Sequence, residues 1–114
     1  MFKKDIYYFK KVLKKYKVYY YFKKGLHECI KEYTQYTYRP TWKQIIGKVW
    51  LENNGLSILS LQSYLSTEHN LHYSIPEVIR TVIKYLINYT PILQEKVTQE
   101  KVVNEICQEM MKND

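Results

Sequence analysis

Two histidines lie close together in this sequence and could take part in metal chemistry. His69 and His72 follow Glu68, and imidazole and carboxylate groups are common zinc ligands. The histidines are three residues apart in a polar stretch that reads as a loop, and the sequence shows no third or fourth ligand group beside them. We therefore expect a solvated connector here and no bound metal.

A second group, His27, Glu28 and Cys29, carries residue types used in nucleophilic catalysis. Adjacent residues on a helix point in different directions, so these three cannot form a nucleophile pair by themselves. The sequence also lacks a phosphate-cradling glycine loop, a nucleophile elbow and a paired-carboxylate signature. Cys29 and the distant Cys107 are expected to be reduced thiols in the core. We expect neither catalysis nor a cofactor.

The third group is a concentration of lysines near the N-terminus. Residues 1–24 hold nine lysines and one carboxylate, whereas residues 25–114 hold nine basic residues and ten carboxylates. The chain has 13 tyrosines and no alanine, a bias that an AT-rich viral, plasmid or parasite genome would produce. Codon bias alone would spread lysine more evenly, so the uneven net charge of +7 indicates function.

Lysines interleaved with tyrosines suit nucleic acid, because lysine neutralises phosphates and aromatic rings stack on bases. The sequence therefore predicts a non-catalytic nucleic-acid-binding protein that favours DNA over RNA and contacts mainly phosphates, with little sequence discrimination. The candidate contact residues are Lys3, Lys4, Lys10, Lys11, Lys14, Lys15, Lys17, Lys23, Lys24, Lys43, Arg80 and Lys84.

The same residues are also compatible with partners other than nucleic acid. As a helical interaction or adaptor module, the protein could bind an acidic protein, because aromatic residues are enriched in interface cores. A basic amphipathic helix also suits an anionic membrane, which ranks lower because aromatic residues spill onto both faces here. The C-terminal segment could form a homo-oligomer. The aromatic residues of the protein-binding alternative are Tyr33, Tyr36, Tyr38, Trp42 and Trp50.

The elements that position the lysines follow from apolar spacing. In the N-terminal segment, helical spacing predicts an amphipathic helix that ends before the strand-like run 18–22, and Gly25 closes the segment. We expect residues 1–25 to form a basic arm or helix, either free or packed as core, and residues 26–114 to form a compact helical body. The predicted apolar face comprises Ile6, Phe9, Val12, Leu13, Tyr16 and Tyr20.

The body is predicted to be all-α, with helices marked by their ends. One helix runs from Leu26 towards Pro40, which stops it. Capping boxes start two more, at Thr41-Trp42-Lys43-Gln44 and at Ser74-Ile75-Pro76-Glu77. Between them, Asn53-Asn54-Gly55 ends one helix and Ser57 or Ser60 starts the next, which runs to about Glu68.

The helix that starts after Ser74 has the strongest apolar stripe in the chain, from Ile75 to Leu86. If it enters a DNA groove, its outward side chains are expected to be Arg80, Thr81, Lys84 and Asn88. Residues 92–111 fit either a helix or two short strands, and we favour a helix because no Gly, Pro or Asn-Gly is present to form a hairpin turn.

Three segments within residues 39–93 form a pattern that is found in a known DNA-binding domain. They are Arg-Pro-Thr-Trp-Lys-Gln-Ile-Ile at 39–46, Asn-Asn-Gly-Leu-Ser through Leu-Gln-Ser-Tyr-Leu at 53–65, and residues 78–86. In this order they resemble the opening of the first helix, the second helix and the third helix of the globular winged-helix domain of linker histones. The resemblance implies a winged-helix or helix-turn-helix body that binds DNA. The glycine-rich wing has no counterpart after Pro91, and the family's basic tail is replaced by one carrying Glu95, Glu100, Glu105 and Glu109.

The only indications of the cellular compartment are features that the sequence lacks. No apolar run approaches the ~18 residues that a membrane span needs. Lysines interrupt the N-terminus every few positions, which excludes the apolar stretch of a signal peptide. We expect an intracellular protein, either nuclear or cytoplasmic.

Overall fold

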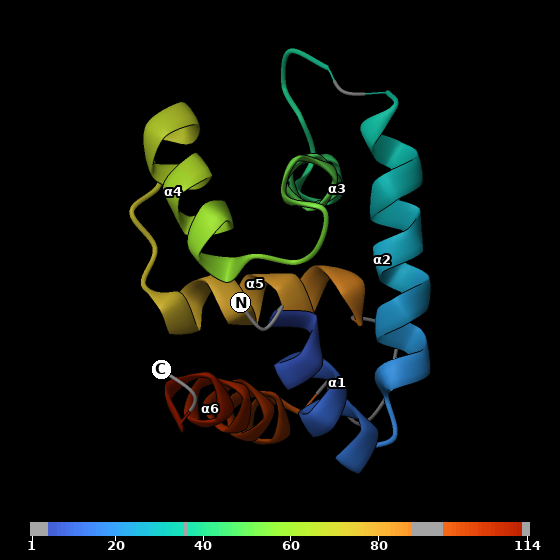
Figure 1. Ribbon diagram of the computed structural model, residues 1–114, viewed down its shortest axis with the longest axis vertical. Coiled ribbons are helices and arrows are strands. Elements are labelled where there is room, and N and C mark those ends of the chain that lie inside the picture. Colours follow the sequence, from blue (N-terminus) through green and yellow to red (C-terminus); the bar gives the residue numbers. More distant parts are fainter. Residues whose placement is uncertain (1–4, 36, 88–94, 113–114) are drawn as a thin grey trace.

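The computed structural model confirms an all-helical architecture for the residues that it describes, 5–35, 37–87 and 95–112. These residues form helices and no strand. In Figure 1, α5 crosses the middle of the molecule, with α3 and α4 on one side, α1 and α6 on the other, and α2 along one edge. The helices are α1 (Asp5–Lys15), α2 (Tyr19–Tyr33), α3 (Trp42–Asn53), α4 (Ile58–His69), α5 (Ile75–Leu86) and α6 (Lys96–Lys112).

The predicted caps start α3, α4 and α5. The hydroxyls of Thr41 and Ser74 each accept a hydrogen bond from the backbone N–H three residues later, and Gln44 and Glu77 accept one from the cap residue's own N–H. Ser57 caps α4 through its hydroxyl. The helical interpretation of the C-terminal segment is confirmed as α6, while residues 92–94 lie outside the described part.

The first helix ends before residue 18, as predicted. The Val18 N–H donates to the Leu13 carbonyl and the Lys17 N–H to the Lys14 carbonyl, each over 3.0 Å, which are the two bonds of a Schellman motif. Lys17 adopts the left-handed conformation (φ 61°) that glycine usually occupies there. The strand-like run that follows is helical instead, because α2 begins at Tyr19.

Gly25 lies within α2, so the prediction that it closes the N-terminal segment is wrong. A Cβ at Gly25 would lie 2.4 Å from the carbonyl oxygen of Leu86, so the missing side chain lets α2 touch the backbone of α5. The missing side chain of Gly47 likewise lets α3 touch the backbone of α2, because a Cβ there would lie 2.1 Å from the carbonyl oxygen of Cys29. The expected boundary after Gly25 therefore falls inside one continuous helix.

The N-terminal segment packs into the same core as the rest of the chain. Phe9 and Phe22 are fully buried, and their rings stack with centroids 5.4 Å apart. They belong to one apolar cluster with residues of α3 to α6, including Ile79 and Ile106. Of the two arrangements left open for this segment, residues 5–24 thus adopt the packed one.

Two tyrosines lie differently from the predicted apolar face. Tyr20 is predicted on that face but is 70% exposed, whereas Tyr8, which is not predicted there, is 6% exposed. Tyr20 is exposed because the chain turns at Lys17 and a new helix, α2, begins after it. The apolar stripe of α1 therefore does not continue into α2 at the same angle.

We expect Phe22→Ala to lower the free energy of unfolding by about 3–5 kcal/mol, because it leaves a cavity in the core. Tyr20→Ala, on the same helix, removes a ring that is 70% exposed and is the matched control. It should change stability by no more than about 0.5 kcal/mol. Urea unfolding followed by circular dichroism measures both. Equal, small decreases would show that the N-terminal helices do not belong to the folded core.

Gly47→Ala should lower the free energy of unfolding by about 1–3 kcal/mol, because the added methyl group meets the backbone of α2 and not a movable side chain. This cost should exceed the ~1 kcal/mol by which alanine favours a helix interior over glycine. Lys31→Ala, on the exposed side of α2, is the control. A Gly47→Ala protein as stable as the wild type in urea would contradict the close packing of α2 on α3.

Candidate nucleic-acid interface

Two of the candidate lysines, both on α1, are paired with carboxylates of α6. The Nζ of Lys11 lies 3.1 Å from Glu109 Oε2, and Lys15 donates to Glu105, which also accepts a hydrogen bond from the Tyr16 hydroxyl. Burial opposes ionisation of Glu105, but the hydrogen bonds from Lys15 and Tyr16 outweigh it and lower the pKa of this carboxyl group. The positive charges of Lys11 and Lys15 are therefore largely balanced within the protein.

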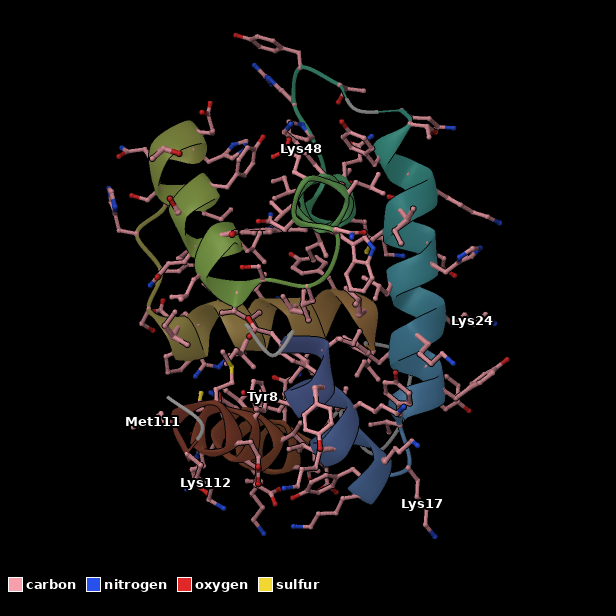
Figure 2. All side chains as sticks on the ribbon, in the orientation of Figure 1. Tyr8, Lys17, Lys24, Lys48, Met111 and Lys112 are labelled. Carbon is pink, nitrogen blue, oxygen red and sulfur yellow. The ribbon has the colours of Figure 1, made fainter. Side chains whose placement is uncertain are left out.

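Five other candidate lysines form a surface that we call the basic face. They come from α1, the turn after it and the first turns of α2, and all are exposed. Within the described part of the chain, none of them has a carboxylate partner. Figure 2 shows Lys17 and Lys24 pointing away from the body. The basic face comprises Lys10, Lys14, Lys17, Lys23 and Lys24.

Three ammonium groups of the basic face converge on the ring of Tyr19. The Nζ atoms of Lys10, Lys14 and Lys23 lie 5.8, 5.9 and 5.7 Å from the ring centroid. The negative face of an aromatic ring attracts cations at this distance and partly offsets their mutual repulsion. Burial of the ring raises the pKa of Tyr19, so its hydroxyl stays protonated at neutral pH. The cluster is a concentrated positive site that an anion would stabilise.

Two exposed tyrosine rings lie in the same part of α2. Tyr20 is 70% and Tyr21 47% exposed, and their rings meet edge to face with centroids 5.4 Å apart. The run of three tyrosines is visible in the sequence, but apolar spacing does not single out Tyr19 or Tyr21. The directions in which these two side chains point depend on the residue at which α2 begins, and the spacing of apolar residues does not predict that residue.

Two candidate basic residues of the body are engaged by carboxylates. Lys43 donates to Glu28 over 3.1 Å. The Arg80 guanidinium makes two hydrogen bonds to Glu100 of α6, at 2.7 and 3.1 Å. The sequence predicts that Arg80 points outward from α5, but α6 packs on that side of the helix and holds the guanidinium.

The remaining candidates differ in how far the structure describes them. Lys84 is exposed, with its Nζ 5.6 Å from the ring centroid of Tyr85. Thr81, expected beside it, donates its hydroxyl to the Glu77 carbonyl within α5. Lys3, Lys4 and Asn88 lie outside the described residues.

The histidines do not assemble a ligand set. The His72 ring lies 3.0 Å from both the Ser66 hydroxyl and the Asn70 side-chain oxygen, whereas His69 packs edge-on against Tyr64. Among the described residues, no three His, Cys, Asp or Glu side chains lie together in a way that could hold a metal ion.

Cys29 is a core residue. It is fully buried, and burial raises the pKa of its thiol to about 12. The thiolate that nucleophilic attack would need is therefore not populated at neutral pH.

The aromatic residues of the protein-binding alternative are dispersed. Trp42 stacks on Tyr73 and Tyr85, with centroids 5.9 and 5.8 Å away, and packs against the core. Tyr38 is 97% exposed. The others are Tyr33, which is partly buried, Trp50, which packs against the core, and Tyr36, which lies outside the described residues.

In the described part of the chain, no helix has the length and apolar character to span a membrane. No family model, curated protein or solved structure matches this chain.

The pairing of Glu105 should make stability depend on pH. Because folding lowers the pKa of Glu105, its contribution is present above the pKa of an unfolded glutamate, about 4.3, and is lost as pH falls through the lowered value. The urea midpoint should fall between about pH 5 and pH 3, and Glu105→Gln should remove part of that fall. Glu68→Gln, at an exposed position on α4, is the control. An unchanged pH profile in Glu105→Gln would contradict the pairing.

Proposed function

We propose that this protein binds nucleic acid, DNA in preference to RNA, without catalysing a reaction, and that the basic face contacts backbone phosphates. The observation that carries the proposal is the convergence of Lys10, Lys14 and Lys23 on Tyr19. Their positive charges add at this part of the surface, and a phosphate bound beside them lowers the electrostatic energy. Binding also releases the counterions condensed on the nucleic acid, which favours association.

The distribution of carboxylates supports this assignment. Helix α6 supplies the carboxylates that pair with Lys11, Lys15 and Arg80, on the side of the molecule that it covers. The basic face receives no such carboxylate from the described residues. The positive potential is therefore concentrated over α1 and the start of α2, where it can steer an anionic polymer to one surface.

The winged-helix resemblance supports the same class of function. The three helices of the linker-histone globular domain would correspond in order to α3, α4 and α5, and proteins of that family bind DNA. Because Arg80 is bonded to Glu100, we assign the phosphate contacts to the basic face and not to a groove-reading surface of α5.

The salt dependence of binding tests the proposal. If each of the five lysines neutralises one phosphate, log affinity should fall against log salt with a slope of about −4 to −5 on duplex DNA and roughly −3.5 on a single strand. Replacing Lys10, Lys14 and Lys23 with glutamine should reduce the magnitude of the slope by about one for each phosphate that is no longer neutralised. Fluorescence anisotropy with a labelled duplex and a labelled single strand, at ~50 and ~200 mM salt, measures it.

The control removes the same amount of charge elsewhere. Lys31, Lys96 and Lys101 are exposed lysines outside the basic face, and their triple glutamine variant should bind almost as the wild type does. Equal weakening by the two triple variants would show that net charge, and not the basic face, is responsible. Tighter binding to poly-glutamate than to either nucleic acid would overturn the proposal in favour of an acidic protein partner.

A further inference from the structure

A groove of 330 Å³ lies beside the basic face, where α2 meets α5. Gly25 and Leu86 lie at the contact between the two helices, Tyr21 and Tyr85 border the groove, and Lys24 contributes a cation. The volume falls within the ~300–1,000 Å³ of ligand-binding clefts, at the small end. It therefore suits a group about the size of one nucleobase and not a folded partner.

The two tyrosine rings that border the groove differ in their surroundings. Tyr85 stacks on Trp42 with an interplanar angle of 25°, and Tyr21 makes its edge contact with Tyr20. Tyr21 is 47% exposed, so ring surface remains accessible to a ligand. Tyr21 is therefore the ring on which a planar ligand can stack, whereas Tyr85 is already contacted by Trp42 and by the Lys84 ammonium group.

The polar groups of the groove match the polar parts of a nucleotide. Lys24 has no carboxylate partner among the described residues and can take a phosphate. Lys43 and Glu28 line the same groove and are hydrogen-bonded to each other over 3.1 Å. That hydrogen bond raises the pKa of Lys43, so its ammonium group stays charged in the groove. The edge of a base offers acceptors and donors in return.

We propose that this groove binds one unpaired base of a single-stranded nucleic acid, with the base stacked on the exposed ring of Tyr21 and Lys24 on the adjoining phosphate. The inference rests on the proposed function and deepens it, because the basic face then carries the flanking phosphates. A base inside a duplex is paired and stacked, so its faces cannot reach the Tyr21 ring. The protein should therefore prefer single strands to duplexes of equal phosphate number.

Two labelled strands of about eight nucleotides separate base binding from phosphate binding. One is oligo-deoxyadenylate, and the other has the same backbone with every base removed. The full-length wild type should bind the first roughly 5- to 150-fold more tightly, the range for one base stacked on an aromatic ring. Tyr21→Leu should abolish this preference and keep the affinity for the abasic strand. Tyr38→Leu, at a ring that is 97% exposed in a loop, should keep both.

A Lys24 variant and the outcomes of the strand comparison distinguish the ways in which the proposal could fail. Lys24→Gln should weaken binding of both strands, because it removes a phosphate contact. Equal wild-type affinity for the two strands, or a preference that Tyr21→Leu retains, would overturn the base site and leave phosphate binding by the basic face intact. If neither strand binds at ~50 mM salt, the proposed function fails as well. Circular dichroism melting of each variant checks that weaker binding does not come from unfolding.

Discussion

The close approach of α2 to the backbones of two other helices is the constraint on which the rest of this structure depends. At Gly47 a Cβ would lie 2.1 Å from the Cys29 carbonyl oxygen, and at Gly25 one would lie 2.4 Å from that of Leu86. A side chain at either position would force whole helices apart, because the atoms that it meets are backbone. α2 can therefore contact both α3 and α5, and through its first turn it fixes where α1 packs.

The placement of charge follows from this packing. With α1 held by α2, one side of α1 faces α6, and there Glu105 and Glu109 balance Lys15 and Lys11. Such partly exposed pairs contribute little to stability individually. Their larger effect is on the electric field, because they neutralise one side of α1 and leave the other side positive. The segment that supplies most of the positive charge is thus an integral part of the fold and also presents an uncompensated surface.

Local signals predict much of the fold, and long-range contacts account for what they miss. The caps at Thr41 and Ser74 involve residues three apart, so the starts of α3 and α5 could be predicted from the sequence alone. Gly25 is predicted to close the N-terminal segment because the local preference of glycine says nothing of a contact with a residue 61 positions later. The pairing of Arg80 with Glu100 likewise needs the position of α6, and the basic face needs the left-handed turn at Lys17 to set the phase of α2.

The proposed base site and the packing of α2 on α5 involve the same stretch of α2, and this relates the function to the fold. Tyr21 and Gly25 are one helical turn apart and so lie on the same side of α2, while Tyr85 precedes the residue that Gly25 touches. Tyr21 and Tyr85 therefore both border the groove that forms where the two helices meet. The contact of Gly25 with Leu86 lies in the wall of this groove, so the packing of the core contributes to its shape. A substitution that separated α2 from α5 would therefore also alter the proposed base site.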